Sequence, residues 1–220
     1  MTGQQAQIEW KNGVPVSKRF DDPYYSLEDG LAETRYVFLE ANGLRSRLRP
    51  GFHVAELGIG TGLNLLALVA LVRETGQGPV RYTGFEAYPL AMADMGAALS
   101  LFPEVAGDAG AFLEAWERGG PLRTSEIEAT FLLGDARHTL PSWEGRADAW
   151  FLDGSAPARN PELWERDLLG EVARHTAPGG TAATYTAAGG VRRALEVAGF
   201  EVERRPGYGR KRHMTAARLP

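Results

Sequence analysis

At 220 residues, with 44% hydrophobic and 24% charged residues, the chain has the composition of an ordinary globular protein with one core. It has no apolar run of about 18 residues that could span a membrane, no secretory signal in its first ten residues, MTGQQAQIEW, and no cysteine for a disulfide or thiolate metal site. We therefore expect a cytoplasmic protein without a metal. The formal net charge of −4 argues against indiscriminate binding of nucleic acid, although residues 192–212 are rich in Arg and Lys.

The first 50 residues predict a hairpin followed by a helix. Residues 8–17, IEWKNGVPVS, place Asn12 and Gly13 between two strand-like stretches, the pattern of a type I′ hairpin. Residues 30–44 have apolar side chains at helical spacing, with Gly43 as a stop signal. The block FDDPYYS at 20–26 lies between them, and it either closes over a ligand as a lid or packs against the core.

From residue 52 onwards, apolar strands alternate with helices, which predicts a doubly wound α/β fold. The predicted strands form a Rossmann-like, mostly parallel seven-stranded sheet: 52–58, 80–86, 127–135, 148–153, 180–186, 200–205 and 212–218. The predicted helices between them are 63–74, 88–100, 104–116, 161–175 and 189–199. We expect a single domain over residues 1–220, in which 1–50 form an N-terminal extension on or over the ligand site and 51–220 form the Rossmann-like core.

A glycine-rich turn, ELGIGTGLN at residues 56–64, follows the first strand of this core. In open α/β sheets a ligand binds beyond the carboxyl ends of the strands, where glycines let the backbone approach it. A dinucleotide turn would read G-x-G-x-x-G, but Leu63 stands where its third glycine should be, and Glu56 would repel a pyrophosphate. A cationic nucleoside, S-adenosylmethionine, suits the acidic residue better, and the pattern resembles the first motif of class I methyltransferases.

Acidic residues also end the next three predicted strands of the core. Glu86 ends the second and can bind ribose hydroxyls, which fits either nucleotide. Asp135 ends the third, where a short acid can meet the adenine amine, and Asp153 ends the fourth. Such regularity favours binding of S-adenosylmethionine over scattered surface charge.

Four further blocks carry a more specific resemblance. They are FDDPYYS at 20–26, GLAETRYVFL at 30–39, WFLDGSAPARNPELW at 150–164 and PGYGRKRHM at 206–214. Together with the glycine turn they resemble the methyltransferase domain of the MnmC family, the bifunctional tRNA 5-methylaminomethyl-2-thiouridine biosynthesis proteins. The resemblance implies a class I methyltransferase that methylates the exocyclic amine of 5-aminomethyl-2-thiouridine at the tRNA wobble position, with S-adenosylmethionine as donor.

The resemblance also implies roles for individual residues. Asp153 would face the amine as the catalytic residue. The expected cofactor contacts are Glu56, Gly58, Gly60, Gly62, Asn64, Glu86, Asp135, Ala136 and Tyr25. The expected substrate and tRNA contacts are Ser155, Pro157, Arg159, Asn160, Tyr185, Arg210, Lys211 and Arg212.

The chain departs from the family in two respects. The family carries a second, flavin-dependent domain, whereas this sequence has none, so we expect a stand-alone methyltransferase without flavin. The bifunctional proteins also have Phe where Ser155 stands, which removes an aromatic contact to the substrate base. Tyr25, Tyr185 and Trp164 are the alternative sources of such a contact, and Trp164 also fits a core position.

The methyl acceptor must be a neutral amine, although an alkylammonium ordinarily loses its proton only near pH 10. Asp153 can accept hydrogen bonds from this amine and orient its lone pair, but a carboxylate also stabilises the ammonium form. Orientation is therefore its expected role, with proton acceptance as a second one. The structural alternative makes Asp153 a helix cap or an ion-pair partner of Arg159.

Other classes of protein share parts of this pattern. A methyltransferase or aminopropyltransferase acting on a small-molecule amine would use the same fold and the same aspartate. A nicotinamide-dependent oxidoreductase is disfavoured by Leu63 and Glu56. A non-catalytic tRNA-binding module would use the basic residues 210–212, which otherwise form a solvated charged surface.

Overall fold

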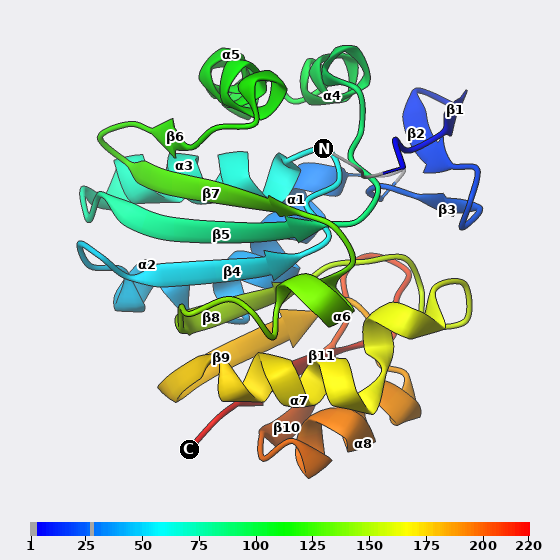
Figure 1. The fold of residues 1–220 in the computed structure, drawn as a ribbon, viewed down its shortest axis with the longest axis vertical. Coiled ribbons are helices and arrows are strands. Elements are labelled where there is room, and N and C mark those ends of the chain that lie inside the picture. The colour runs from blue at the N-terminus through cyan, green and yellow to red at the C-terminus, as the bar shows by residue number, and fades with distance from the viewer. Residues whose placement is uncertain (1–3, 27–28) are drawn as a thin grey trace.

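The computed structural model describes residues 4–26 and 29–220, and its centre is an eight-stranded mixed sheet (Figure 1). The order of its strands is β10-β11-β9-β8-β4-β5-β7-β6. The neighbours from β9 to β7 pair in parallel, whereas β6, β10 and β11 pair antiparallel with their neighbours. The strand bounds are β4 His53–Leu57, β5 Val80–Glu86, β6 Leu122–Arg123, β7 Ile127–Leu133, β8 Ala147–Leu152, β9 Thr176–Thr184, β10 Glu201–Pro206 and β11 His213–Arg218.

Helices cover both faces of the sheet (Figure 1). One face packs against η1, α3, α4 and α5, and the other against α6, α7 and α8. The helix bounds are α1 Gly30–Thr34, η1 Arg35–Glu40, α2 Leu44–Arg47, α3 Leu63–Thr75, α4 Met92–Leu99, α5 Pro103–Arg118, α6 Ala136–Thr139, η2 Pro161–Trp164, α7 Arg166–Arg174 and α8 Gly189–Val197. In the described part of the chain, no helix is long and apolar enough to cross a membrane.

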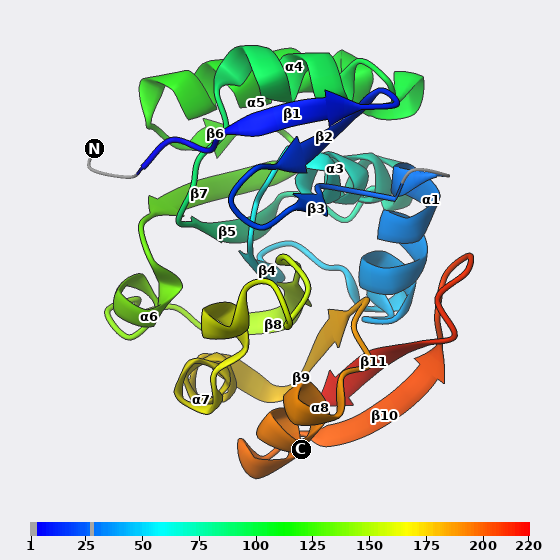
Figure 2. The same cartoon turned by 90° about the vertical axis from the view of Figure 1, so that its right-hand side faces the viewer.

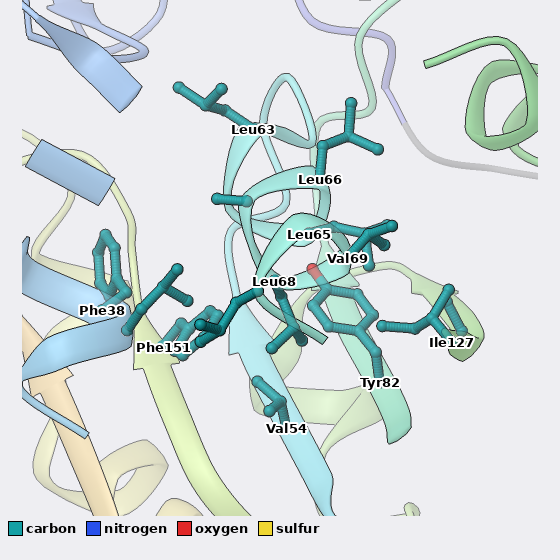
Figure 3. Packing of buried hydrophobic residues seen from close by; sticks show 14 of the residues in the cluster. Phe38, Val54, Leu63, Leu65, Leu66, Leu68, Val69, Tyr82, Ile127 and Phe151 are labelled. Atoms are coloured by element: carbon teal, nitrogen blue, oxygen red, sulfur yellow. The ribbon is translucent and has the colours of Figure 1, made fainter. Parts of the chain in front are cut away.

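Strand β4 occupies the middle of the sheet, and all five of its residues are buried. This burial is expected of a parallel strand that has helices on both sides. Its side chain Val54 packs beneath α3, whose Leu65, Leu66 and Leu68 are wholly buried (Figure 3). The chain order reverses between β4 and β8, so a crevice opens at the carboxyl ends of these two strands.

The N-terminal segment forms a separate three-stranded antiparallel sheet, β1 Ile8–Lys11, β2 Val14–Ser17 and β3 Asp22–Pro23. Asn12 and Gly13 both have positive φ, 52° and 78°, which confirms the hairpin predicted there. Figure 2 shows this small sheet lying across the carboxyl edge of the large one, close to α4.

The fold confirms the predicted α/β architecture and corrects some details. The eighth strand, β6, was not predicted because only two residues pair with β7 at the edge of the sheet. The helix predicted at 30–44 consists of α1, the π-helix η1 and α2. The helix predicted at 161–175 begins as a short 3₁₀ helix and is interrupted at Glu165, whose extended backbone (ψ 148°) separates it from α7.

Candidate active site

A cavity of about 840 Å³ lies at the carboxyl edge of the large sheet. The N-terminal segment, the glycine loop after β4, the ends of β5, β7 and β8, and the loop between β10 and β11 all contribute to its lining. Its volume falls within the range of pockets that hold small ligands and cofactors. The crevice expected from the strand order therefore coincides with this cavity.

The glycine loop fits closely against the end of β8. Gly58 has φ of 87°, and its N–H donates to the carbonyl of Phe85 at 2.9 Å. A Cβ atom at Gly58 would lie 1.8 Å from the backbone oxygen of Asp153. Only glycine therefore lets the loop pass this close to Asp153 in this backbone conformation.

Glu86 at the end of β5 is held by two backbone groups of the site. Its Oε2 accepts from the N–H of Gly60 at 3.0 Å, and its Oε1 accepts from the N–H of Tyr88 at 2.7 Å. Burial raises the pKa of this carboxyl, while the hydrogen bond from Gly60 lowers it. Each carboxylate oxygen has a second lone pair, so Glu86 can still accept hydrogen bonds from a ligand in the cavity.

Asp135 caps the N-terminus of α6. Its Oδ1 accepts from the N–H of Arg137 at 2.9 Å, and its carboxylate forms an ion pair with the Arg137 guanidinium at 2.7 Å. These contacts hold the pKa of Asp135 below its ordinary value. The side chain is therefore ionised at neutral pH and presents a negative charge to the cavity that it lines.

Asp153 is the first residue after β8 and lines the cavity. Its N–H donates to the carbonyl of Leu57 at 3.0 Å, and its Oδ2 accepts from Nδ2 of Asn64 at 2.7 Å. Burial raises the pKa of Asp153 to about 7. The charges of Glu33 and Asp22 add to this rise. The hydrogen bond from Asn64 and the charge of Lys211 oppose it. Near neutral pH this carboxyl can both accept hydrogen bonds and exchange a proton.

The loop between β10 and β11 brings a cation to the same cavity. Nζ of Lys211 lies 2.5 Å from Oε1 of Glu33 and 4.4 Å from the centre of the Tyr185 ring. The hydroxyl of Tyr185 donates to the carbonyl of Gly154 at 2.6 Å. Lys211 therefore connects α1, the end of β9 and the region that follows Asp153.

Residues 110–220 match a family model described as S-adenosyl-L-methionine-dependent methyltransferase. The chain belongs to this family of methyltransferases. Its cofactor is accordingly S-adenosyl-L-methionine, and its fold is that of the class I enzymes.

This methyltransferase is also similar to much longer proteins. It is 41% identical over 230 residues to the tRNA 5-methylaminomethyl-2-thiouridine biosynthesis bifunctional protein MnmC of Stutzerimonas stutzeri (strain A1501), a match that covers 98% of this chain and 35% of that protein. With the MnmC protein of Pseudomonas aeruginosa (strain UCBPP-PA14) it shares 44% identity over 225 residues, which cover 96% of this chain and 34% of that protein. The chain thus spans about a third of the length of these curated relatives.

Among solved structures, the crystal structure of MnmC2 from Aquifex aeolicus is similar, with a TM-score of 0.79 and 25% identity. The match covers 99% of this chain and 72% of that one. Together with the relatives, it confirms the resemblance to MnmC inferred from the sequence motifs.

The residues around the cavity of the methyltransferase fit the cofactor. The lining includes the carboxylates of Glu86 and Asp135, which can accept hydrogen bonds from the ribose hydroxyls and the adenine amine of the cofactor. The buried hydroxyl of Tyr25 has no hydrogen-bond partner among the described residues, although Tyr25 lines the cavity. A ligand with polar atoms would give this hydroxyl the partner that buried polar groups ordinarily have.

Most of the site residues predicted from the sequence come together around this cavity. Those that line it are Tyr25, Gly58, Gly60, Asn64, Glu86, Asp135, Ala136, Asp153, Ser155, Arg159, Asn160, Tyr185, Arg210 and Lys211. Their location agrees with the predicted roles in binding, which remain predictions.

Four predicted residues lie outside the lining. Glu56 is wholly buried behind it, where it accepts hydrogen bonds from Asn64 and Tyr82. Gly62 is also buried, and a Cβ atom there would lie 2.2 Å from the ring of Phe112, so this glycine allows α5 to pack on the loop. The other two are Pro157 and Arg212, of which Arg212 is exposed.

Two structural alternatives predicted for the stretch after β8 concern Arg159 and Trp164. Arg159 forms its ion pair with Asp21, at 2.6 Å, and Asp153 is hydrogen-bonded to Asn64 instead. Trp164 is buried, and its Nε1 donates to the carbonyl of Ser155 at 2.9 Å. Trp164 therefore supports the loop, which leaves Tyr25 and Tyr185 as cavity-lining aromatics among the three predicted.

The sequence did not identify the acidic residues that face Asp153 from the N-terminal half of the chain. Asp22 lines the cavity, and its Oδ2 accepts from the N–H of Ala156 at 2.7 Å. Glu33 lines it from α1. Both stand within motifs that resemble the family, FDDPYYS and GLAETRYVFL, and their charges raise the pKa of Asp153. An acid in a predicted turn or helix gives no local signal that it acts on residue 153.

Proposed function

We propose that this protein methylates the exocyclic amine of 5-aminomethyl-(2-thio)uridine at the tRNA wobble position, giving 5-methylaminomethyl-(2-thio)uridine. The observation that carries the proposal is the carboxylate of Asp153, which lies in the cavity beside the glycine loop. The names of the relatives refer to biosynthesis of this nucleoside, and the chain matches them over nearly its whole length.

The electrostatics of the cavity favour an amine as the acceptor. Asp22, Glu33 and Asp153 line it together, so a cationic aminomethyl group would gain from binding there. The raised pKa of Asp153, about 7, allows this carboxylate to take a proton that the bound ammonium must lose. Lys211, paired with Glu33, offsets part of the negative charge and thus helps the neutral amine to form.

The residues of the chain bring the reactants into line. S-adenosyl-L-methionine supplies a methyl group on a sulfonium, and its transfer needs the attacking nitrogen in line with the carbon–sulfur bond. Asp153 accepts a hydrogen bond from the amine and orients its lone pair. Glu86 and the backbone of Gly60, joined at 3.0 Å, form the part of the lining that is proposed to hold the nucleoside of the cofactor.

A wobble uridine lies in an unpaired loop, where it can be turned out of the stack into a cavity. Arg159, Arg210 and Lys211 are exposed residues of the cavity lining, and Arg212, which follows Lys211 in the chain, is also exposed. We expect these cations to bind phosphates on either side of the base. Tyr185 is the proposed aromatic contact to the base in place of the phenylalanine that Ser155 replaces.

We further propose that residues 1–220 form one domain in which residues 1–50 pack on the Rossmann-like core and contribute to the cofactor site. Residues 1–3 and 27–28 of this range lie outside the described residues. A tRNA substrate also implies a cytoplasmic location.

The proposal is tested by incubating the protein with methyl-labelled S-adenosyl-L-methionine and two tRNA preparations, one bearing 5-aminomethyl-2-thiouridine and one lacking it. Label should enter only the first preparation and should be recovered as 5-methylaminomethyl-2-thiouridine after nucleoside analysis. Transfer to a small amine such as spermidine, with none to tRNA, would instead indicate an enzyme of small-molecule amines.

A second measurement tests the binding of RNA. Replacing Arg210 and Arg212 by Gln should raise the KM for tRNA. The slope of the logarithm of tRNA affinity against the logarithm of salt concentration should become shallower by about one unit per lost phosphate contact. The matched control is Arg123→Gln, because Arg123 lies on β6, at the opposite edge of the sheet from β10. Equal effects of both variants on KM would contradict the proposed RNA contact.

A further inference from the structure

Asn64 occupies the second position of α3, directly after the glycine loop, and its side chain is buried. Both polar atoms of its amide are engaged within the site. Its Nδ2 donates to Oε1 of Glu56 at 2.6 Å and to Oδ2 of Asp153 at 2.7 Å, and its Oδ1 accepts from the hydroxyl of Thr34 at 2.8 Å. One amide therefore joins two carboxyl groups and a hydroxyl that come from three separate segments.

These partners determine the orientation of the amide. An ionised carboxylate only accepts hydrogen bonds, so Nδ2 must face Asp153 when that residue is ionised, and Oε1 of Glu56 accepts from the same amide nitrogen. The hydroxyl of Thr34 supplies the donor that the carbonyl oxygen needs on the other side. In the flipped orientation Oδ1 would face the carboxylate of Asp153, which would replace a favourable contact by a repulsive one, and the hydroxyl of Thr34 would lose its acceptor. Asn64 is thus fixed as a double donor.

Glu56 serves this arrangement from behind the cavity. It is fully buried, and the hydroxyl of Tyr82 donates to its Oε2, so the carboxyl cannot turn towards the cavity without breaking this contact. Burial raises its pKa well above the ordinary value, with the charge of Asp153 as the next cause. Asn64 therefore lies between two carboxyl groups that would otherwise face each other.

The effect of Asn64 on Asp153 follows from the same contact. The groups that act on the pKa of Asp153 include Asn64, Glu33, Lys211 and Asp22, and the hydrogen bond from Asn64 is the largest of the influences that favour its ionised form. Glu56, Tyr82 and Tyr185 also lie close enough to feel the charge of Asp153. The bond engages Oδ2. No other hydrogen bond to a carboxylate oxygen of Asp153 is seen among the described residues, so Oδ1 stays available to the acceptor.

We propose that Asn64 is a positioning residue for the methyl-acceptor site, which holds Oδ2 of Asp153 so that Oδ1 faces the amine and which favours the ionised carboxylate. This inference rests on the proposed role of Asp153 and gives Asn64 a task that differs from the cofactor contact predicted for it. Thr34 and Glu56 support the task by fixing the amide.

The test compares the pKa of Asp153 in Asn64→Ala and Asn42→Ala. The carboxyl carbon of Asp153 is titrated by NMR in protein labelled with ¹³C at aspartate, and no tRNA is added. Asn42 is a matched control because it is equally buried and joins three groups, the carbonyls of Phe38 and Trp150 and the hydroxyl of Thr181. Asn64→Ala should move the titration of Asp153 upwards by about one unit, the size of one lost hydrogen bond to a carboxylate. Asn42→Ala should leave it unchanged.

Activity gives a second readout. In single-turnover methyl transfer, the acid limb of the pH profile of Asn64→Ala should move upwards with the NMR titration, and the rate should fall about tenfold or more. Binding of S-adenosyl-L-methionine, measured by calorimetry, should change by less than about threefold. An unchanged titration of Asp153 together with a large loss of cofactor affinity would overturn the inference and make Asn64 a cofactor ligand.

Thr34→Val provides the same test if Asn64→Ala does not fold, because it removes only the hydroxyl that fixes the amide. It should move the titration of Asp153 in the same direction by a smaller amount, and an unmoved titration would count against the inference. Since the NMR measurement needs no acceptor, the proposed tRNA activity can fail while the contact between Asn64 and Asp153 is still confirmed. Conversely, a protein that methylates tRNA but shows no change at Asp153 would refute the positioning role alone.

Discussion

Replacing Asp153 by Asn should abolish methyl transfer and at the same time stabilise the folded protein above neutral pH. Folding raises the pKa of Asp153 from 3.8 to about 7, mainly by burial. A pKa difference of about three units corresponds to about 4 kcal/mol, at about 1.36 kcal/mol per unit. This is the amount by which ionisation of Asp153 lowers the free energy of unfolding, because the charged form is less stable in the folded protein. Asn has nearly the same shape, can still accept from Asn64 and carries no charge.

The sign of the pH dependence is fixed by the direction of this shift. Below about pH 4 the carboxyl is protonated in both states and the wild-type protein bears no penalty. Between about pH 4 and pH 7 the unfolded state releases the proton first, so the free energy of unfolding falls as the pH rises, and the full loss is reached above pH 7. Asp153→Asn should lack this decline.

The assay is urea unfolding of both proteins without cofactor at a series of pH values from 4 to 8. The difference in unfolding free energy, variant minus wild type, should be near zero at pH 4 and approach about 4 kcal/mol at pH 8. Methyl transfer by the variant should be at least about 100-fold slower. A difference that does not vary with pH would refute the claim that this carboxyl is desolvated, whatever happens to the activity.

Three further predictions concern the loop, the cofactor and the core. Gly58→Ala should destabilise the protein by about 3 kcal/mol or more in thermal unfolding and should displace Asp153. The control is Gly76→Ala, because Gly76 also has a positive φ, 66°, but a Cβ atom there would have no atom within 4 Å. This variant should lose only about 1 kcal/mol in the same assay. Tyr25→Phe should leave stability unchanged but weaken S-adenosyl-L-methionine about 2- to 10-fold by calorimetry, because its hydroxyl has no partner among the described residues. Burial lowers the pKa of His53 from 6.5 to about 4. The free energy of unfolding should therefore fall as the pH falls from 6.5 to 4, because the unfolded state takes up the proton first. In urea unfolding, His53→Gln should reduce that loss by up to about 3 kcal/mol.

The sequence predicts the sheet and the place of the site well because both depend on local patterns. Apolar runs that end in an acid or a glycine identify β4, β5 and β8, and the carboxyl ends of parallel strands lie at the same edge of a sheet. Asp153 therefore falls in the cavity as its position after β8 predicts.

The direction of each side chain within the site depends on residues far away in the chain and could not be predicted. Glu56 and Gly62 stand in the same motif as Gly58 and Gly60. Glu56 turns inwards because Tyr82 and Asn64 bind it there, and Gly62 is needed because Phe112 packs on it. A motif gives the residue types of such a loop but not the partners on its two sides.

The N-terminal segment is joined to the loop after β8 by a contact that spans a large part of the chain. The carboxylate of Asp22 accepts from the N–H of Ala156, 134 positions later, and Arg159 bonds the backbone of Phe20. During synthesis at about 5–20 residues per second, the first of these segments would wait roughly 7 to 27 s for its partner to be made. A ribosome-bound chain would consequently acquire its acceptor site late, so a nascent chain stalled before residue 156 should not yet have methyl-transfer activity.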